Sequence, residues 1–225
     1  MAVGKAGQIA GGVVAAVVLA LVLAQILIPK IAAASISSKL GHYGRVQDVS
    51  VSAWPAVKLL WGNADSVKVR MRSLDVSTHQ AANLVSEARG AAELQLTATS
   101  AKVGPLAVQR VALGKHGDKL TAAADATAAA VDAALPPGVS LALVRSEGGS
   151  VVVRASGGLF GVSASVDAVA GPQEGRLVAR PLGLLLSGFQ LTLFADPHVY
   201  VEGVAASPLA GEAGGYSLQM NARLR

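Results

Sequence analysis

The stretch Ser66-Val-Lys-Val-Arg-Met-Arg72 decides the fold class of this chain. Its apolar and basic residues alternate strictly, with Val67, Val69 and Met71 set against Lys68, Arg70 and Arg72. A period of two is typical of a β-strand with one buried face and one face in water. Such strands belong to antiparallel sheets, because parallel sheets are covered on both faces and their strands are continuous apolar runs. We therefore predict a mostly antiparallel sheet.

The same alternation recurs further along the chain, in residues 92–99, 160–168 and 216–225. Short helices are predicted at 54–61, at 78–89 after an N-cap at Ser77 or Thr78, and at 127–135. Hairpin turns are predicted at four pairs of turn residues, Gly148-Gly149, Gly157-Gly158, Gly171-Pro172 and Gly214-Gly215. These elements predict one α+β domain, in which a curved, mostly antiparallel sheet packs on a few short helices.

The N-terminal segment is the most apolar part of the sequence, and residues 9–28 are almost wholly aliphatic. Twenty helical residues span about 30 Å, the thickness of the hydrocarbon core of a bilayer. Lys5 and the N-terminal amine form a short positive region, which predicts a cytoplasmic N-terminus and an extracytoplasmic bulk. Ala32-Ala33-Ala34 also offers a signal-peptide cleavage site. We expect a retained single-pass anchor within residues 1–34 and one extracytoplasmic domain over residues 35–225; the alternative is a secreted protein cleaved after Ala34.

Composition excludes several classes of protein. Hydrophobic residues make up 52% of the 225 positions, enough for a sizeable core, and the absence of cysteine excludes disulfides and thiolate chemistry. The net charge of +5 is small and dispersed, and aromatic residues are only 4% of the chain. Both observations argue against a nucleic-acid partner, which needs a clustered basic face or stacking platforms.

Catalytic and metal-binding motifs are absent from the sequence. It contains no H-E-x-x-H, no P-loop, no G-x-G-x-x-G and no G-x-S-x-G. We therefore predict no catalytic residue, no metal and no cofactor. An exported hydrolase stays open as an alternative, because a triad can assemble from distant positions. It would require a serine and a carboxylate beside one of the four histidines, His42, His79, His116 or His198.

Several apolar and basic residues are candidates for lipid contact. The runs 182–186 and 189–194 are more apolar than a strand with one wet face requires, so they line an acyl chain or pack against protein on both sides. Trp54 and Trp61 flank a short helical segment and are either core residues or an interfacial foot or groove lip. The predicted lipid-binding residues are Trp54, Leu59, Leu60, Trp61, Phe189 and Phe194. The predicted headgroup residues are Lys68, Arg70 and Arg72, which are otherwise a solvated strand face.

One segment carries a more specific pattern. Residues 54–69 (WPAVKLLWGNADSVKV) combine an aromatic-Pro start, a Leu-Leu-aromatic-Gly run and an alternating strand, and they follow Val46-x-x-Val49-x-Val51. This arrangement, over residues 46–76, resembles the actinobacterial LmeA-like phospholipid-binding family, formerly catalogued as a domain of unknown function. The resemblance implies a lipid-binding envelope protein associated with the assembly of phosphatidylinositol-derived glycolipids. It also implies a tubular lipid-binding fold, in which a curved antiparallel sheet wraps helices around an acyl-chain groove.

The sequence thus predicts a non-catalytic protein of the cell envelope that binds the acyl chains of a phospholipid or glycolipid, with the membrane as its partner. Support of glycolipid assembly (of the lipomannan type) or lipid transfer fits this prediction. The rival prediction is a scaffold protein whose fully packed domain holds an envelope protein partner. An elongated apolar cavity would favour lipid binding, whereas a dense core with an exposed apolar patch would favour the scaffold.

Overall fold

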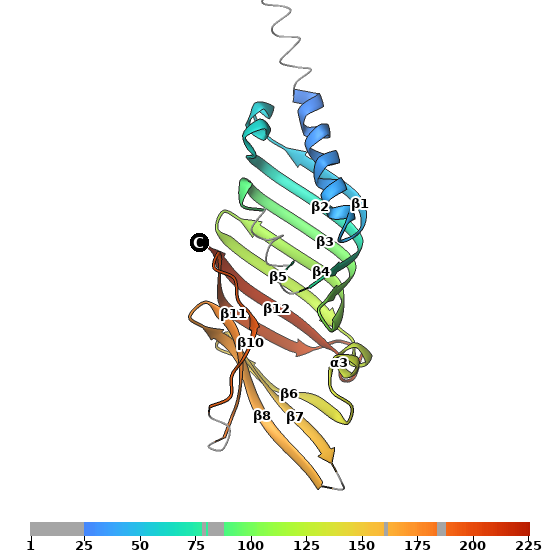
Figure 1. Ribbon diagram of the computed structural model, residues 1–225, viewed down its shortest axis with the longest axis vertical. Helices are drawn as coiled ribbons and strands as arrows, with labels where there is room; N and C mark the ends of the chain where they lie inside the picture. The colour runs from blue at the N-terminus through green and yellow to red at the C-terminus, as the bar shows by residue number, and fades with distance from the viewer. Residues whose placement is uncertain (1–24, 78–79, 81–87, 160–161, 184–187) are drawn as a thin grey trace, which may run out of the picture.

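The computed structural model describes residues 25–77, 80, 88–159, 162–183 and 188–225, which form two β-sheets and a few short helices (Figure 1). The seven-stranded sheet contains β1 (Gly44–Ser52), β2 (Ala64–Val76), β3 (Ala91–Val103), β4 (Leu106–His116), β5 (Lys119–Ala126), β11 (Val199–Pro208) and β12 (Tyr216–Leu224). The five-stranded sheet contains β6 (Val139–Glu147), β7 (Ser150–Leu159), β8 (Val162–Gln173), β9 (Arg176–Pro181) and β10 (Leu191–Phe194). The α+β class is as predicted, but the strands form two sheets where a single curved sheet was predicted.

Most neighbouring strands run antiparallel. The strand order is β1-β2-β3-β4-β5-β12-β11 in the larger sheet and β10-β9-β8-β7-β6 in the smaller one. Of the strand pairs in the described residues, β2 and β3 alone run parallel. The antiparallel prediction is therefore confirmed for the sheets as a whole, and it missed the one parallel pair.

The alternating stretch lies in β2, as its pattern predicts. Val67, Val69 and Met71 are buried, and the three basic residues between and after them are exposed on the opposite face. In β3 the buried residues Leu94, Leu96 and Ala98 alternate with exposed polar residues in the same way. The neighbouring buried faces of β1, β2 and β3 form the first core of the molecule.

Two irregularities interrupt the alternation. In β1 the register shifts between Val46 and Asp48, which lets Val46 and Val49 pack against the same core although they are three residues apart. In β2, β3 and β4, two successive inward-facing residues are three positions apart instead of two. These steps pair with one another across the sheet: Met71 to Leu74, Ala98 to Ala101, and Val111 to Val108. The register shift in β1 is of the bulge type, which bends a strand and increases its twist.

A helix over residues 25–41 covers the buried face of the first strands (Figure 1). Its Leu40 belongs to the first core, and Ala32, Ala33 and Ile36 pack against that core. The helix continues without a break across the bond between Ala34 and Ser35, where the sequence offers a cleavage site. Within the described ranges no helix is both long and apolar enough to cross a bilayer. Most of the predicted anchor, residues 9–24, lies outside those ranges.

The short helices agree with their capping signals. The helix α3 (Ala128–Ala134) begins after Thr127, whose hydroxyl accepts a hydrogen bond from the Ala130 N–H at 3.2 Å. Ser77 and Gln80 form a reciprocal capping box, which identifies Ser77 as the N-cap. Most of the helix predicted at 78–89 lies outside the described residues, and η2 (Ala88–Gly90) is a turn of 3₁₀-helix. The segment after Trp54-Pro55 also forms a 3₁₀-helix, η1 (Ala56–Trp61).

Two predicted turns are wrong. Gly157-Gly158 lies inside β7 and Gly171-Pro172 lies inside β8. A Cβ on Gly171 would stand 2.4 Å from the Ser150 hydroxyl, and one on Gly157 would stand 3.4 Å from the Gly138 carbonyl oxygen. These glycines permit close approach of a neighbouring chain segment instead of a turn. The predicted turns at Gly148-Gly149 and Gly214-Gly215 do join consecutive strands.

The two sheets meet where turns of the smaller sheet lie along β11, the last strand of the larger one. The Val204 N–H donates to the Gly149 carbonyl, and the Val201 N–H donates to the Gly175 carbonyl, both at 2.8 Å. Gly203 and Gly149 approach so closely that a Cβ on Gly203 would lie 3.2 Å from the Gly149 Cα. The turns of one sheet thus satisfy backbone groups that an edge strand would otherwise expose.

Candidate functional site

A cavity of about 250 Å³ lies at the junction of the two sheets and α3. Leucine, valine and alanine side chains form its wall, and Tyr216 carries the one side-chain polar group among them. The lining residues come from β4, β5, β6, β7 and β12 of the two sheets and from the α3 region, with one more from β11: Leu106, Ala126, Val131, Ala134, Leu135, Leu141, Ala142, Leu143, Val151, Val153, Ala206, Tyr216 and Leu218. We call it the junction cavity. Such a wall can hold a hydrocarbon chain and offers nothing to a charged ligand.

The helix α3 forms one side of the junction cavity because of its sequence pattern. Val131 and Ala134 line the cavity, whereas Ala129 and Ala133 are exposed on the other side of the helix. The helix ends at Ala134, and Pro136-Pro137 prevents its continuation. This short helix therefore presents one apolar face to the junction.

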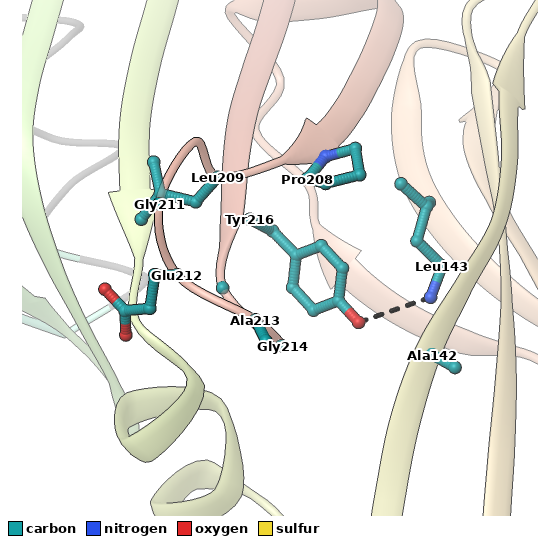
Figure 2. Close-up of a pocket in the computed structure, with 10 residues that line it drawn as sticks. Ala142, Leu143, Pro208, Leu209, Gly211, Glu212, Ala213, Gly214 and Tyr216 are labelled. Atoms are coloured by element: carbon teal, nitrogen blue, oxygen red, sulfur yellow. Dashed lines mark hydrogen bonds between the residues drawn. The ribbon is translucent and has the colours of Figure 1, made fainter.

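Tyr216 links the two sheets beside this cavity (Figure 2). Its hydroxyl accepts a hydrogen bond from the Leu143 N–H at 3.3 Å and donates one to the Leu141 carbonyl at 3.1 Å. The phenol is thus held by the backbone of β6, while Tyr216 itself belongs to β12. Because Tyr216 lines both the junction cavity and its neighbour, its ring forms a shared wall between them.

The neighbouring pocket measures about 520 Å³ and lies beneath the loop between β11 and β12. It shares Ala142, Leu143 and Tyr216 with the junction cavity. Glu212, at the middle of the loop, accepts a hydrogen bond from the Ala128 N–H at 3.0 Å, which fastens the loop to the start of α3. The two pockets therefore adjoin: aliphatic side chains and one tyrosine line the junction cavity, and the other pocket is bordered by backbone and a single carboxylate.

The tryptophan segment predicted as a binding site lies elsewhere. Trp54, Leu60 and Trp61 are 73%, 68% and 72% exposed, so the interpretation of these residues as core is wrong. Leu59 is half-buried and packs against the first core. None of the four lines the junction cavity or its neighbour. They lie at the β1–β2 end of the larger sheet, and three strands, β3, β4 and β5, stand between β2 and β12.

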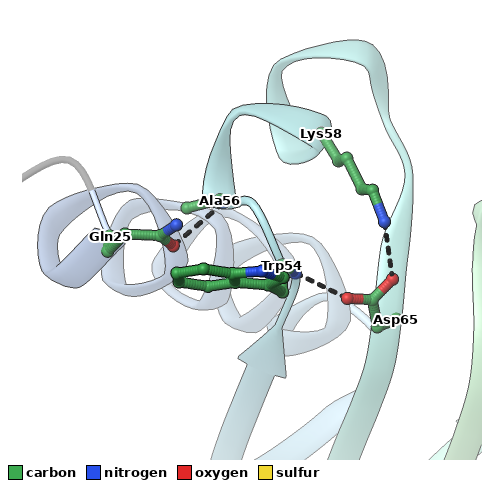
Figure 3. A network of polar contacts seen from close by, with 5 residues as sticks. All are labelled: Gln25, Trp54, Ala56, Lys58 and Asp65. Carbon is green, nitrogen blue, oxygen red and sulfur yellow. Dashed lines mark hydrogen bonds and ion pairs between the residues drawn. The ribbon is translucent and has the colours of Figure 1, made fainter. Parts of the chain in front are cut away.

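Hydrogen bonds hold the tryptophan segment in place (Figure 3). The Asp65 carboxylate accepts the Trp54 N–H at 2.5 Å and lies 3.4 Å from the Lys58 Nζ. The backbone hydrogen bond from Trp54, with a smaller contribution from Lys58, lowers the pKa of Asp65 below its ordinary value. On the other side, the Gln25 side chain accepts the Ala56 N–H at 2.9 Å.

The two predicted phenylalanines are separate from the tryptophans. Phe189 is 67% exposed. Phe194, in β10, is half-buried and packs against a small core made by Leu120, Val199 and Ala222. The structure therefore does not bring the six predicted lipid-binding residues into one site.

The predicted headgroup residues lie on the outer face of the larger sheet. Lys68, Arg70 and Arg72 are exposed along β2, opposite the face that the helix over residues 25–41 covers. In the order of the sheet, β3, β4 and β5 separate β2 from β12. A ligand in the junction cavity would not meet these cations.

Two of the described histidines make polar contacts, and neither contact includes a serine. His116 Nδ1 lies 3.1 Å from a Glu93 carboxylate oxygen, and both side chains are largely exposed. His198 contributes its backbone N–H to the Asp196 carboxylate at 2.8 Å. His79 lies outside the described residues. Neither described contact lies in a pocket that borders a serine.

Lys115 is the one charged side chain that is buried in the described part of the chain. Its Nζ donates to the backbone carbonyls of Ala91 and Arg89. Desolvation lowers the pKa of this amine. The contacts join β4 to the start of β3 and lie apart from both pockets.

Sequence reasoning missed the residues of the junction cavity. Val131 falls in the helix predicted at 127–135 and Leu218 in the alternating stretch 216–225, but nothing in either pattern says that they face the same cavity. Comparison with known proteins adds no assignment: no family model matches the chain, and neither curated proteins nor solved structures include a significant match.

Proposed function

We propose that this is a non-catalytic, membrane-anchored protein of the cell envelope that binds an acyl chain of a phospholipid or glycolipid in the junction cavity. The observation that carries the proposal is the lining of that cavity, where aliphatic side chains from both sheets and α3 converge. Apolar cavities of this kind stay dry and bind apolar ligands. The resemblance of residues 46–76 to the LmeA-like family supports the same class of ligand.

The size of the junction cavity limits what it can enclose. At about 250 Å³ it is slightly smaller than typical small-molecule pockets, which measure about 300–1,000 Å³. It therefore takes part of an acyl chain, and the rest of the lipid extends through the adjoining pocket beneath the β11–β12 loop. No lysine or arginine lines that pocket. The headgroup consequently stays in solvent and contributes less to binding than the chain.

The envelope location in this proposal rests on the predicted anchor. Residues 9–28 form the proposed single membrane span, with the N-terminus in the cytoplasm. A reporter that is active only outside the cytoplasm, fused after Arg225, should be active. Activity of a cytoplasm-only reporter at the same position would refute the proposed topology.

The binding proposal is tested by filling the cavity. Ala134→Phe adds an aromatic ring on the cavity side of α3, and Ala133→Phe adds the same ring on its exposed side. The full-length protein and both variants are delipidated in detergent, incubated with palmitoyl-oleoyl phosphatidylglycerol and examined by native mass spectrometry. Wild type and Ala133→Phe should carry one bound lipid, and Ala134→Phe should carry none while melting at a similar temperature. Absence of a stoichiometric adduct on wild type, or an equal adduct on Ala134→Phe, would sink the proposal.

A scaffold role has one observation in its favour. Leu182, Phe189, Leu191 and Leu193 are exposed around β10, at the free edge of the five-stranded sheet. Exposed apolar residues at a sheet edge are suited to a protein partner. If wild type binds no lipid but a Leu191→Ser variant loses an envelope protein that copurifies with wild type, the scaffold function is the better one.

A further inference from the structure

We propose that the end of the molecule formed by η1 and the first turn of the described helix is a membrane-docking surface, on which Trp54 and Trp61 lie in the headgroup region of a lipid bilayer. We call this surface the tryptophan tip. Docking there relies on the same membrane anchor as the proposed function, and it does not depend on the junction cavity. It is a second lipid contact, made with the bilayer itself and not with a bound lipid.

Exposed apolar side chains are concentrated at the tryptophan tip. Large hydrophobic residues that are at least 39% exposed gather there on η1, just before it, and at the start of the helix: Ile26, Leu27, Trp54, Val57, Leu60 and Trp61. Soluble surfaces rarely carry so many large apolar groups together, and such patches mark protein or membrane contacts.

The position of the tryptophan tip beside the apolar run 9–28 decides between a protein partner and a membrane. The described helix begins at Gln25, whose side chain holds the Ala56 N–H, so η1 lies directly beside the last turn of the apolar run 9–28 (Figure 3). If that run spans the bilayer, its end at Ile28 marks the membrane surface. The hydrogen bond then sets η1 at the same level, where lipid is the partner within reach.

The residue types at the tryptophan tip are those found at the surface of a membrane. Tryptophan is enriched at membrane interfaces because its ring is apolar and its N–H is polar. Lys30 follows the apolar run in the sequence, and Lys58 lies on η1 between the two tryptophans in the sequence. Basic side chains near a bilayer surface are attracted to anionic headgroups.

The tip is held in one shape before it meets a membrane. Asp65 fixes the Trp54 backbone, and η1 is capped by Gly62, which has a left-handed conformation (φ 76°) and donates its N–H to the Leu59 carbonyl. A rigid apolar surface loses little conformational freedom on insertion.

The sequence provides its own reporter, because Trp54 and Trp61 are the two tryptophans of the chain. Intrinsic tryptophan fluorescence therefore reports on the tip alone. The full-length protein is reconstituted into vesicles of phosphatidylcholine and phosphatidylglycerol, with or without phosphatidylcholine brominated high on its acyl chains. Iodide in the buffer is the aqueous quencher. We expect brominated lipid to remove most of the emission and iodide to quench it weakly.

The matched control is a variant whose single tryptophan lies away from the tryptophan tip. In a Trp54→Phe/Trp61→Phe background, Phe189→Trp places the reporter at an exposed position beside β10. This variant should respond to iodide and be insensitive to brominated lipid. Strong iodide quenching of the wild-type tryptophans would overturn the proposal, and so would shielding from both quenchers, which would mean that a protein or a second copy covers the tip. Loss of lipid loading in Ala134→Phe leaves this measurement unchanged, so the two proposals can fail separately.

Discussion

The Gln25 side-chain oxygen accepts the backbone N–H of Ala56 at 2.9 Å, across 31 positions of sequence. Ala56 is 1% exposed, so its N–H has no access to water. A buried donor of this kind requires a partner, and Gln25 supplies it from the start of the helix. The bond joins the end of the predicted membrane segment to η1.

Removing this acceptor should destabilise the tip. Gln25→Ala leaves the buried Ala56 N–H without a partner, at a cost of about 1–3 kcal/mol. Gln25→Glu keeps an oxygen in place and is the matched control. Hydrogen exchange at the Ala56 amide, followed by mass spectrometry on the full-length protein in detergent, should be accelerated in Gln25→Ala alone. Equal exchange in wild type and Gln25→Ala would contradict the role of this contact.

The mature protein should keep residues 25–34. The possible cleavage position after Ala34 lies within a continuous helix, and Ala32 and Ala33 pack against the first core. Cleavage there would remove these contacts together with the Gln25 hydrogen bond. Intact-mass measurement of the protein isolated from membranes should give a chain that includes the anchor. A mature N-terminus at Ser35 would refute this prediction.

Substitutions in η1 should separate surface residues from core residues. Leu60→Ser and Trp61→Ser change largely exposed side chains and should alter the free energy of unfolding by about 0.5 kcal/mol or less. Met71→Ala, at a side chain that is 1% exposed, should cost about 2–5 kcal/mol. Denaturant unfolding of the full-length protein in one detergent compares them. A collapse of stability in Trp61→Ser comparable to that of Met71→Ala would show that the tip is packed and not a free surface.

Much of the larger sheet could be predicted from the sequence because alternation reports which face of a strand is buried. It identified β2, β3 and β12 and most of their inward residues, although Ala92, on the predicted apolar face of the stretch 92–99, is exposed. It could not reveal strand partners, since Val69 would show the same period beside a parallel or an antiparallel neighbour. The turn glycines misled for a related reason: Gly171 serves a close approach to Ser150, and that need arises only after β7 and β8 have paired.

The candidate sites differ in how far the sequence could locate them. The tryptophan tip could be located from the sequence, because Trp54 to Trp61 is a continuous stretch. The sequence did not decide whether these residues are buried or exposed. The junction cavity is assembled from both sheets and α3, and Leu141 and Leu218 look like ordinary strand positions. A site made by long-range packing has no short motif, and three-dimensional structure was needed to find it.

Acid should loosen the tryptophan segment through Asp65. The pKa of its carboxyl is lowered in the folded protein, first by the hydrogen bond from the Trp54 N–H and then by Lys58. A depressed folded pKa means that the stabilisation is fully present above the unfolded pKa of about 3.9 and is lost as pH falls through the folded value. Wild type should therefore exceed Asp65→Asn in melting temperature at pH 7, and the gap should shrink at about pH 3.

The control for this prediction is Asp132→Asn, at an exposed position on α3. It should leave the melting temperature close to that of wild type at pH 7, so that loss of a negative charge alone does not explain the effect of Asp65→Asn. Tryptophan fluorescence gives a second measure, because Trp54 is bonded to the titrating group. A gap between wild type and Asp65→Asn that stays constant from pH 7 to about pH 3 would rule out the ionised Asp65 as the source of the stabilisation, since a carboxylate effect must disappear once the group is protonated.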